Sequence, residues 1–325
     1  MRPCIPITLL CLLLAACNAP APTTTEAKPE AASRPLPAGE RRIKVPDGTE
    51  LYVKVAGRGP VCLFVHGGPG QGSLSFERMG GDSLEAFLTM VYLDQRGSGK
   101  SSNATDYHLD RVVQDMEDVR RQLGVDKPCL IAHSFGGILA VAYAQRYPEH
   151  VSALVMANTS LHFMSDEQRR MQIHFVSTLL KNPSLDVADD VSGEALAAAH
   201  ARARAALQES GNGYRFLSDD KKTVRTMSEL DESYPRTIDY GMAVVTRPND
   251  LPEYYRDYTP VTADIRIPVL ILSGRRDHAV GPEHYKTFRF PHQQVVQLDS
   301  GHLPYYENTR DFAAAIRDFM TTIAP

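Results

Sequence analysis

The sequence predicts an α/β protein in which a mostly parallel sheet carries helices on both faces. With 325 residues, of which 43% are hydrophobic and 23% charged, the chain suits one large globular domain or two ordinary ones. Several short runs are apolar at almost every position, which is typical of strands buried on both faces. Amphipathic segments separate these runs, and strands that alternate with helices form parallel sheets.

The sheet is expected to begin with a hairpin. Residues 41–45 and 50–56 flank Asp47-Gly48, a dipeptide typical of tight turns between antiparallel strands. The following strands are expected at 61–65, 90–94, 129–133, 153–157, 269–273 and 295–298, and the main helices at 108–123, 135–147 and 307–320.

Residues 158–262 interrupt this alternation. They are rich in Ala, Arg, Glu and Tyr, contain helical stretches such as 194–208, and include no clear buried strand. We therefore expect a helical cap at 158–262, inserted between the two parts of one core at 41–157 and 263–325.

The N-terminus has the pattern of a targeting signal. A single Arg precedes an apolar stretch at 5–16, which is too short to span a bilayer. The stretch ends in Leu-Ala-Ala-Cys, which resembles a bacterial lipobox, so residues 1–16 are expected to be a lipoprotein signal peptide and Cys17 the lipidated residue. The alternative is an ordinary signal peptide cleaved near Ala16 or Ala19.

A lipid on Cys17 would anchor the protein to a membrane of a bacterial cell envelope. A diacylglycerol and an N-acyl chain together supply the several lipid chains that stable anchoring requires. In the bacterial lipoprotein pattern Asp at the next position favours the inner membrane. Asn18 therefore favours the outer membrane, with the protein facing the periplasm. Residues 17–40 are rich in Ala, Pro, Thr and Glu and are expected to be a disordered tether, so the anchor is the only expected membrane contact.

Composition argues against several other classes of protein. The 35 Lys and Arg residues and 39 Asp and Glu residues give a net charge of −4, which provides no basic surface for nucleic acid. The five cysteines lack zinc-site spacing and the histidines lack metal-ligand spacing, so we expect no metal and no other cofactor. Cys62 and Cys129 lie in apolar runs and are expected to be buried free thiols, with a disulfide as the alternative.

The strongest catalytic signal is Ser134. An apolar strand leads directly into this serine, and Gly136 and Gly137 follow it at the start of a helix. This strand–turn–helix context is typical of a serine nucleophile, because the turn is too tight for large neighbours. The alternative is a serine that only caps a buried helix.

A glycine-rich loop at 66–70 follows the strand at 61–65. Glycines allow backbone N–H groups to point into a site, so the N–H of Gly68 and the N–H of Phe135 are expected to form an oxyanion hole. The alternative is a loop that serves only as a turn. His66 is expected to be a structural member of this loop.

Chain order predicts the partners of the serine. In a nucleophile-elbow site the acid and then the histidine follow the serine. Asp277 follows the strand at 269–273 and His302 follows the strand at 295–298, so both lie at carboxyl ends of strands, where ligands bind in open α/β sheets. His278 and Asp299 are the competing candidates.

Together these motifs resemble those of α/β-hydrolases of the proline iminopeptidase family. The resemblance rests on His-Gly-Gly-Pro-Gly at 66–70, Asp-Gln-Arg-Gly at 94–97, the Ser134 turn, Asp277 and His302. It implies an eight-stranded sheet, a helical cap and release of N-terminal residues, often proline, from peptides. Asp94 and Arg96 themselves are expected to brace their loop.

The chain departs from the family at the turn and in the cap. Phe135 stands where proline-specific members usually have Trp, and Ala132 replaces the first glycine of the turn. Family members grip the free amine of the substrate with acidic cap residues. Here the candidates for substrate binding are Glu232, which we rank first, Glu229 and Asp231, and a solvated charged face is the alternative for all three.

The expected function is that of a serine hydrolase that removes the N-terminal residue from short peptides through an acyl-enzyme on Ser134, with proline as a candidate for that residue. An esterase or lactonase with the same three residues is the alternative, so the partner is a small peptide or an ester. From another class, a catalytically inactive binding lipoprotein would retain the fold without turnover.

Overall fold

The computed structural model describes Met1 and residues 36–323. The predicted signal peptide, Cys17 and the tether up to residue 35 therefore lie outside the described residues. Within the part that is described, no helix is both long and apolar enough to cross a membrane.

The core is a sheet of eight strands within residues 36–323. Its order is β1-β2-β4-β3-β5-β6-β7-β8; β1 and β2 run antiparallel to their neighbours, and the remaining pairs are parallel. The strands are β1 (Gly39–Lys44), β2 (Glu50–Gly57), β3 (Val61–Val65), β4 (Thr89–Leu93), β5 (Cys129–His133), β6 (Ala153–Ala157), β7 (Val269–Gly274) and β8 (Gln293–Leu298). The predicted fold class, including the hairpin at the start, is confirmed.

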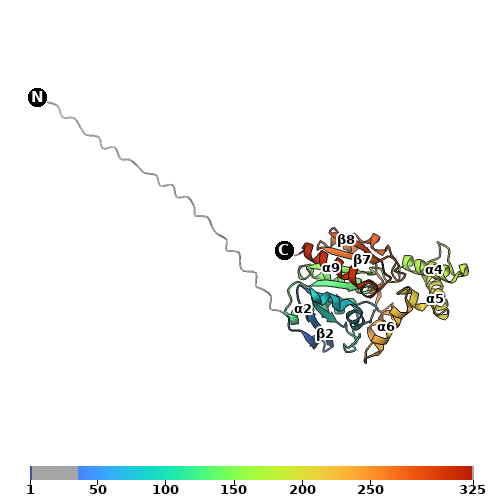
Figure 1. Ribbon diagram of the computed structural model, residues 1–325, viewed down its shortest axis with the longest axis horizontal. Coiled ribbons are helices and arrows are strands. Elements are labelled where there is room, and N and C mark those ends of the chain that lie inside the picture. The colour runs from blue at the N-terminus through green and yellow to red at the C-terminus, as the bar shows by residue number, and fades with distance from the viewer. Residues whose placement is uncertain (2–35, 324–325) are drawn as a thin grey trace. The chain divides into compact units, whose positions relative to one another are not determined.

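Helices cover both faces of this sheet (Figure 1). The helices are α1 (Leu74–Arg78), α2 (Leu109–Leu123), α3 (Gly136–Arg146), α4 (Asp166–Leu180), α5 (Gly193–Glu209), α6 (Lys221–Glu232), α7 (Asp239–Thr246), α8 (Pro304–Glu307) and α9 (Thr309–Ile323). α2 and α3 pack on one face, while α1 and α9 pack on the other.

Alternation along the strand explains why an inner strand such as β3 is apolar throughout. Successive side chains point to opposite faces, so Leu63 and Val65 pack with α2 and α3, whereas Cys62 and Phe64 pack with α1 and α9. Cys62 lies opposite Cys129 on the neighbouring strand, and both are buried free thiols, as predicted.

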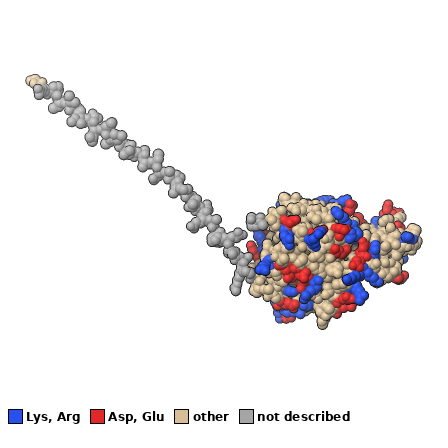
Figure 2. All heavy atoms as spheres, in the orientation of Figure 1, with Lys and Arg blue, Asp and Glu red and all other residues tan. Residues whose placement is uncertain are grey.

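The described segment between β6 and β7 is helical, with α4 to α7 and several short 3₁₀ helices but no strand. Figure 1 shows α4, α5 and α6 gathered on one side of the sheet. α4 and α5 bury a small core of their own, which includes Ile173, Val176, Leu196 and Leu207. This cluster is separate from the two clusters of buried residues that flank the sheet. On the face shown in Figure 2, acidic and basic side chains are interspersed.

Candidate active site

Ser134 occupies a tight turn between β5 and α3. Its φ of 54° lies in the left-handed region, which is uncommon for a residue with a side chain. The turn packs closely against β3: a Cβ on Gly136 would lie 2.2 Å from the carbonyl oxygen of Val65. A glycine is therefore required at 136. The turn places the serine at the carboxyl end of β5.

Three side chains from the ends of β5, β7 and β8 form one hydrogen-bonded chain. Ser134 Oγ lies 2.9 Å from Nε2 of His302, and Nδ1 of His302 lies 2.9 Å from Oδ2 of Asp277. The structure thus brings together the three residues that the sequence predicted as catalytic, although 168 positions separate Ser134 from His302.

Asp277 is fully buried, yet its surroundings favour the carboxylate. Its Oδ1 accepts hydrogen bonds from the backbone N–H groups of Ala279 at 2.8 Å and Val280 at 3.0 Å. Burial alone would raise the pKa of Asp277, but the imidazole of His302 and these hydrogen bonds bring the pKa below its usual value. An ionised Asp277 can orient the imidazole and stabilise its protonated form.

The competing candidates lie outside this chain of hydrogen bonds. The ring of His278 stacks on Phe175 with centroids 3.9 Å apart, and burial lowers its pKa. Asp299 is exposed and forms an ion pair with Arg276. The geometry therefore favours Asp277 and His302 over their neighbours.

The glycine loop after β3 is packed against the serine turn. A Cβ on Gly67 would lie 2.7 Å from the carbonyl oxygen of His133 and 2.7 Å from Cβ of Ser134. The next residue, Gly68, has a φ of 112°. Within residues 36–323, the backbone N–H groups of Gly68 and Phe135 have no hydrogen-bond acceptor. Two available donors beside the serine are what an oxyanion hole requires.

His66 holds this loop in place. Its Nε2 accepts the backbone N–H of Gln95 at 3.0 Å, and its Nδ1 lies 3.0 Å from the carbonyl oxygen of Gly67. Burial lowers the pKa of the imidazole, so it stays neutral and suits the structural role that we expected.

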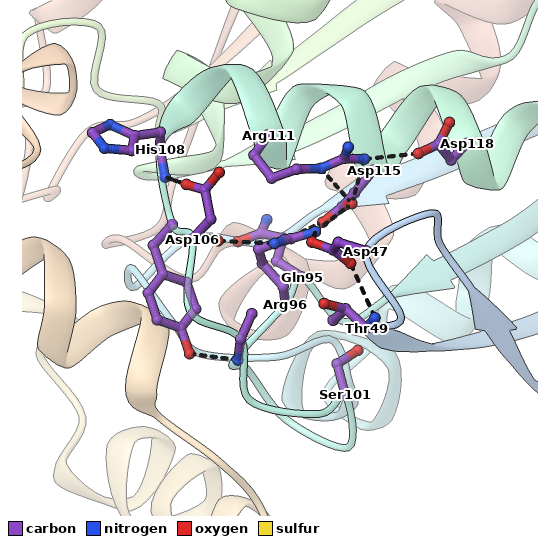
Figure 3. A network of polar contacts seen from close by, with 12 residues as sticks. Asp47, Thr49, Gln95, Arg96, Ser101, Asp106, His108, Arg111, Asp115 and Asp118 are labelled. Carbon is purple, nitrogen blue, oxygen red and sulfur yellow. Dashed lines mark hydrogen bonds and ion pairs between the residues drawn. The ribbon is translucent and has the colours of Figure 1, made fainter.

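Asp94 and Arg96 brace the loop after β4. Asp94 accepts backbone N–H groups from Ser73 and Lys100, both at 2.7 Å. The guanidinium of Arg96 is fully buried and binds both carboxylate oxygens of Asp115, on α2, and also Asp47 in the hairpin turn (Figure 3). These contacts join the hairpin, α2 and the loop after β4, and neither residue takes part in the chain of hydrogen bonds at Ser134.

The three acidic cap residues differ in their surroundings. They lie on α6, where successive positions are turned by about 100° around the axis. Glu229 is exposed and pairs with Arg225 at 2.7 Å, and Glu232 is also exposed. Asp231 has only 5% of its surface exposed. The orientation of α6 about its axis, which the sequence alone did not establish, places Asp231 on the buried side of the helix. Glu229 and Glu232 lie on the exposed side.

Asp231 contacts the residue that directly follows the glycine loop. Nε2 of Gln71, the residue after Gly70, donates a hydrogen bond to Oδ2 of Asp231, and Arg236 lies 3.6 Å from the same oxygen. The other oxygen, Oδ1, is buried and has no hydrogen-bond partner among the described residues. Burial raises the pKa of Asp231 to about 6, against the opposing influence of Arg236 and Gln71. No sequence motif distinguishes Gln71, so its contact with Asp231 was not predicted.

No set of metal ligands is evident in the described part of the chain. Residues 36–323 contain no group of three or more His, Cys, Asp or Glu side chains arranged to hold a metal ion. The arrangement at Ser134 is suited to nucleophilic attack on a carbonyl carbon, with proton transfer through His302.

Fold and site together define the class of this protein. Residues 60–309 match the family described as the alpha/beta hydrolase fold. The chain therefore belongs to the alpha/beta hydrolase family.

Individual proteins show which members of this family the chain resembles. A proline iminopeptidase from Heyndrickxia coagulans is 27% identical over 277 residues, which cover 82% of this chain and 92% of that protein. A crystal structure of a proline iminopeptidase-related protein from Thermus thermophilus has a TM-score of 0.69 at 23% identity, covering 88% of this chain and 99% of that one. A thermophilic esterase from Thermogutta terrifontis has a TM-score of 0.65 at 21% identity, covering 89% and 100%. The structural similarities show the shared fold, and the sequence comparison adds proline iminopeptidase homologues at modest identity.

Proposed function

We propose that this protein is a serine hydrolase that removes the N-terminal residue from short peptides. The observation that carries the proposal is the chain of hydrogen bonds from Ser134 through His302 to Asp277, with two unengaged N–H groups beside the serine. The proline iminopeptidase homologues support the aminopeptidase class.

The geometry supports a two-step mechanism. Ser134 Oγ attacks the carbonyl carbon while Nε2 of His302 takes its proton, and the N–H groups of Gly68 and Phe135 stabilise the oxyanion. The tetrahedral intermediate collapses as His302 gives the proton to the departing amine, leaving an acyl group on Ser134. A water then loses a proton to His302 and attacks the ester carbon. The bond to Ser134 breaks as His302 returns that proton to Oγ, and the acid leaves.

Asp231 supports peptides with a free amine as substrates. A substrate ammonium enclosed beside the oxyanion loop needs a carboxylate partner, because an unpaired charge in a closed site is costly. Asp231 is buried, contacts the loop through Gln71, and has one oxygen available. We therefore transfer the proposed amine contact from Glu232 and Glu229 to Asp231.

Replacing Asp231 by Asn tests this assignment. We expect kcat/KM on aminoacyl arylamides with a free amine to fall roughly 10- to 150-fold, since a charge-assisted hydrogen bond of about 1.5–3 kcal/mol is lost. Rates on N-acetylated arylamides and simple acyl esters should hardly change. Glu232→Gln, on the exposed face of the same helix, is the matched control and should leave all rates near those of the wild type.

The same variant gives a pH readout. Because the pKa of Asp231 is about 6, its carboxyl group is protonated and neutral below that pH and ionised above it. The preference of the wild type for free-amine over ester substrates should therefore rise as pH increases through about 6, whereas that of Asp231→Asn should not. Equal wild-type rates on blocked and free substrates would assign the protein to the esterases.

We also propose that the enzyme is held at a bacterial envelope membrane by lipid on Cys17. The support is the lipobox-like sequence that ends at this cysteine. Cys17→Ser should release the protein into the soluble fraction with kcat and KM unchanged, because Cys17 precedes the core strands by more than 20 residues. Fractionation with a wash that strips peripheral proteins measures this. A variant that stays with the membrane would contradict the lipid anchor.

A further inference from the structure

The end of β6 contacts all three loops that carry the proposed catalytic residues. The carbonyl oxygen of Ala157 accepts the backbone N–H of Ser134 at 3.2 Å. The following residue, Asn158, reaches the other two loops with its side chain. Ala157 and Asn158 thus lie between the loops that carry the proposed nucleophile, acid and histidine.

The amide of Asn158 bridges the acid loop and the histidine loop. Its Oδ1 accepts the backbone N–H of Gly274 at 2.7 Å, and its Nδ2 donates to the carbonyl oxygen of Gly301 at 2.9 Å. Gly274 lies three positions before Asp277, and Gly301 directly precedes His302. Asn158 is fully buried and has a φ of 45°, so the backbone is held in a strained conformation at this bridge.

The two bridged loops are in direct backbone contact. A Cβ on Gly274 would lie 2.1 Å from the carbonyl oxygen of Gly301. The backbone N–H of Arg276 donates to the carbonyl oxygen of Ser300 at 2.9 Å. The loops therefore approach too closely for a side chain between them, and the Asn158 amide is the side-chain group that bonds both Gly274 and Gly301.

We propose that Asn158 is a positioning residue that sets the distance and orientation between Asp277 and His302 by bridging Gly274 and Gly301. The inference rests on the proposed serine-hydrolase function. An amide suits this place because it offers one acceptor and one donor. Asp would lack the donor and set a carboxylate against the carbonyl of Gly301.

Asn158→Gly is the sharpest test. Glycine tolerates the left-handed φ, so this variant removes the bridge while relieving backbone strain. We expect kcat, normalised to active sites titrated with a fluorophosphonate, to fall roughly 10- to 100-fold, because small misplacements of catalytic groups cost about that much. KM should stay within about twofold, since Asn158 lies outside the proposed amine contact. The rate constant for labelling of Ser134 should fall with kcat.

Asn158→Asp is a second variant of the same size, and it carries the test if the glycine variant does not fold. It keeps the acceptor for Gly274 and loses the donor for Gly301, so a similar loss of kcat is expected. Thr159→Val is the matched control: Thr159 is fully buried, its Oγ1 has no hydrogen-bond partner within the described residues, and the change preserves shape.

A spectroscopic measurement separates positioning from stability. In the wild type the proton between His302 Nδ1 and Asp277 should give a strongly deshielded NMR resonance, which should shift or broaden in both Asn158 variants and stay in Thr159→Val. Wild-type kcat per titrated site with an unchanged resonance in either variant would overturn the proposal. Ser134→Ala is assayed in parallel: if it retains wild-type turnover, the proposed function itself fails, independently of Asn158.

Discussion

Replacing Ser134 by Ala is expected to lower kcat by about 10⁶-fold, with the protein still folded. The substitution removes the Oγ that we propose forms the acyl-enzyme, while His302 and Asp277 keep their mutual hydrogen bond. Ala and Ser both carry a Cβ, so the substitution introduces no new group at the φ of 54°. Hydrolysis of an aminoacyl arylamide, measured together with covalent labelling by a fluorophosphonate, provides the readout.

Ser152→Ala is the control for this experiment. Ser152 is an exposed serine just before β6, and its replacement should leave both turnover and labelling unchanged. Circular dichroism establishes that both variants are folded. Turnover by Ser134→Ala above about 1% of the wild-type value, with labelling retained, would show that another residue is the nucleophile.

Asp277→Asn is expected to lower kcat by roughly 10⁴-fold. The N–H groups of Ala279 and Val280 hold the oxygen that faces them, so the new NH₂ group must point at His302. Nδ1 of His302 would then have to accept a hydrogen bond, which leaves the ring proton on Nε2, facing Ser134. In that tautomer the imidazole cannot take the proton of the serine.

Asp299→Asn is the matched control for the acid. Asp299 is exposed and pairs with Arg276, so its replacement should change kcat by less than about twofold. Kinetics at saturating substrate, with active sites titrated in each variant, provide the comparison. A large loss in Asp299→Asn with near-normal turnover in Asp277→Asn would reverse the assignment of the acid.

The sequence alone predicted the class of the sheet, the positions of its buried strands and which ends of those strands carry the candidate site residues. Strands buried on both faces must be apolar at every position, so the runs at 61–65, 129–133 and 153–157 matched β3, β5 and β6 to the residue. The carboxyl ends of parallel strands meet at one edge of a sheet. Ser134, Asp277 and His302, each following such a run, were therefore expected to lie close together.

The tertiary structure alone decided which acidic residues of the segment between β6 and β7 are buried and which groups they contact. The acidic residues at 229, 231 and 232 look equivalent in the sequence, and only the packing of α6 beside α1 and Gln71 makes Asp231 the buried one. The bridging position of Asn158 could not be predicted either, because a single Asn after a strand forms no recognisable sequence motif. Its place depends on Gly274 and Gly301, which follow it by more than 100 positions. Local patterns determine which segments form strands and helices, whereas a polar contact between distant loops exists only once the chain has folded.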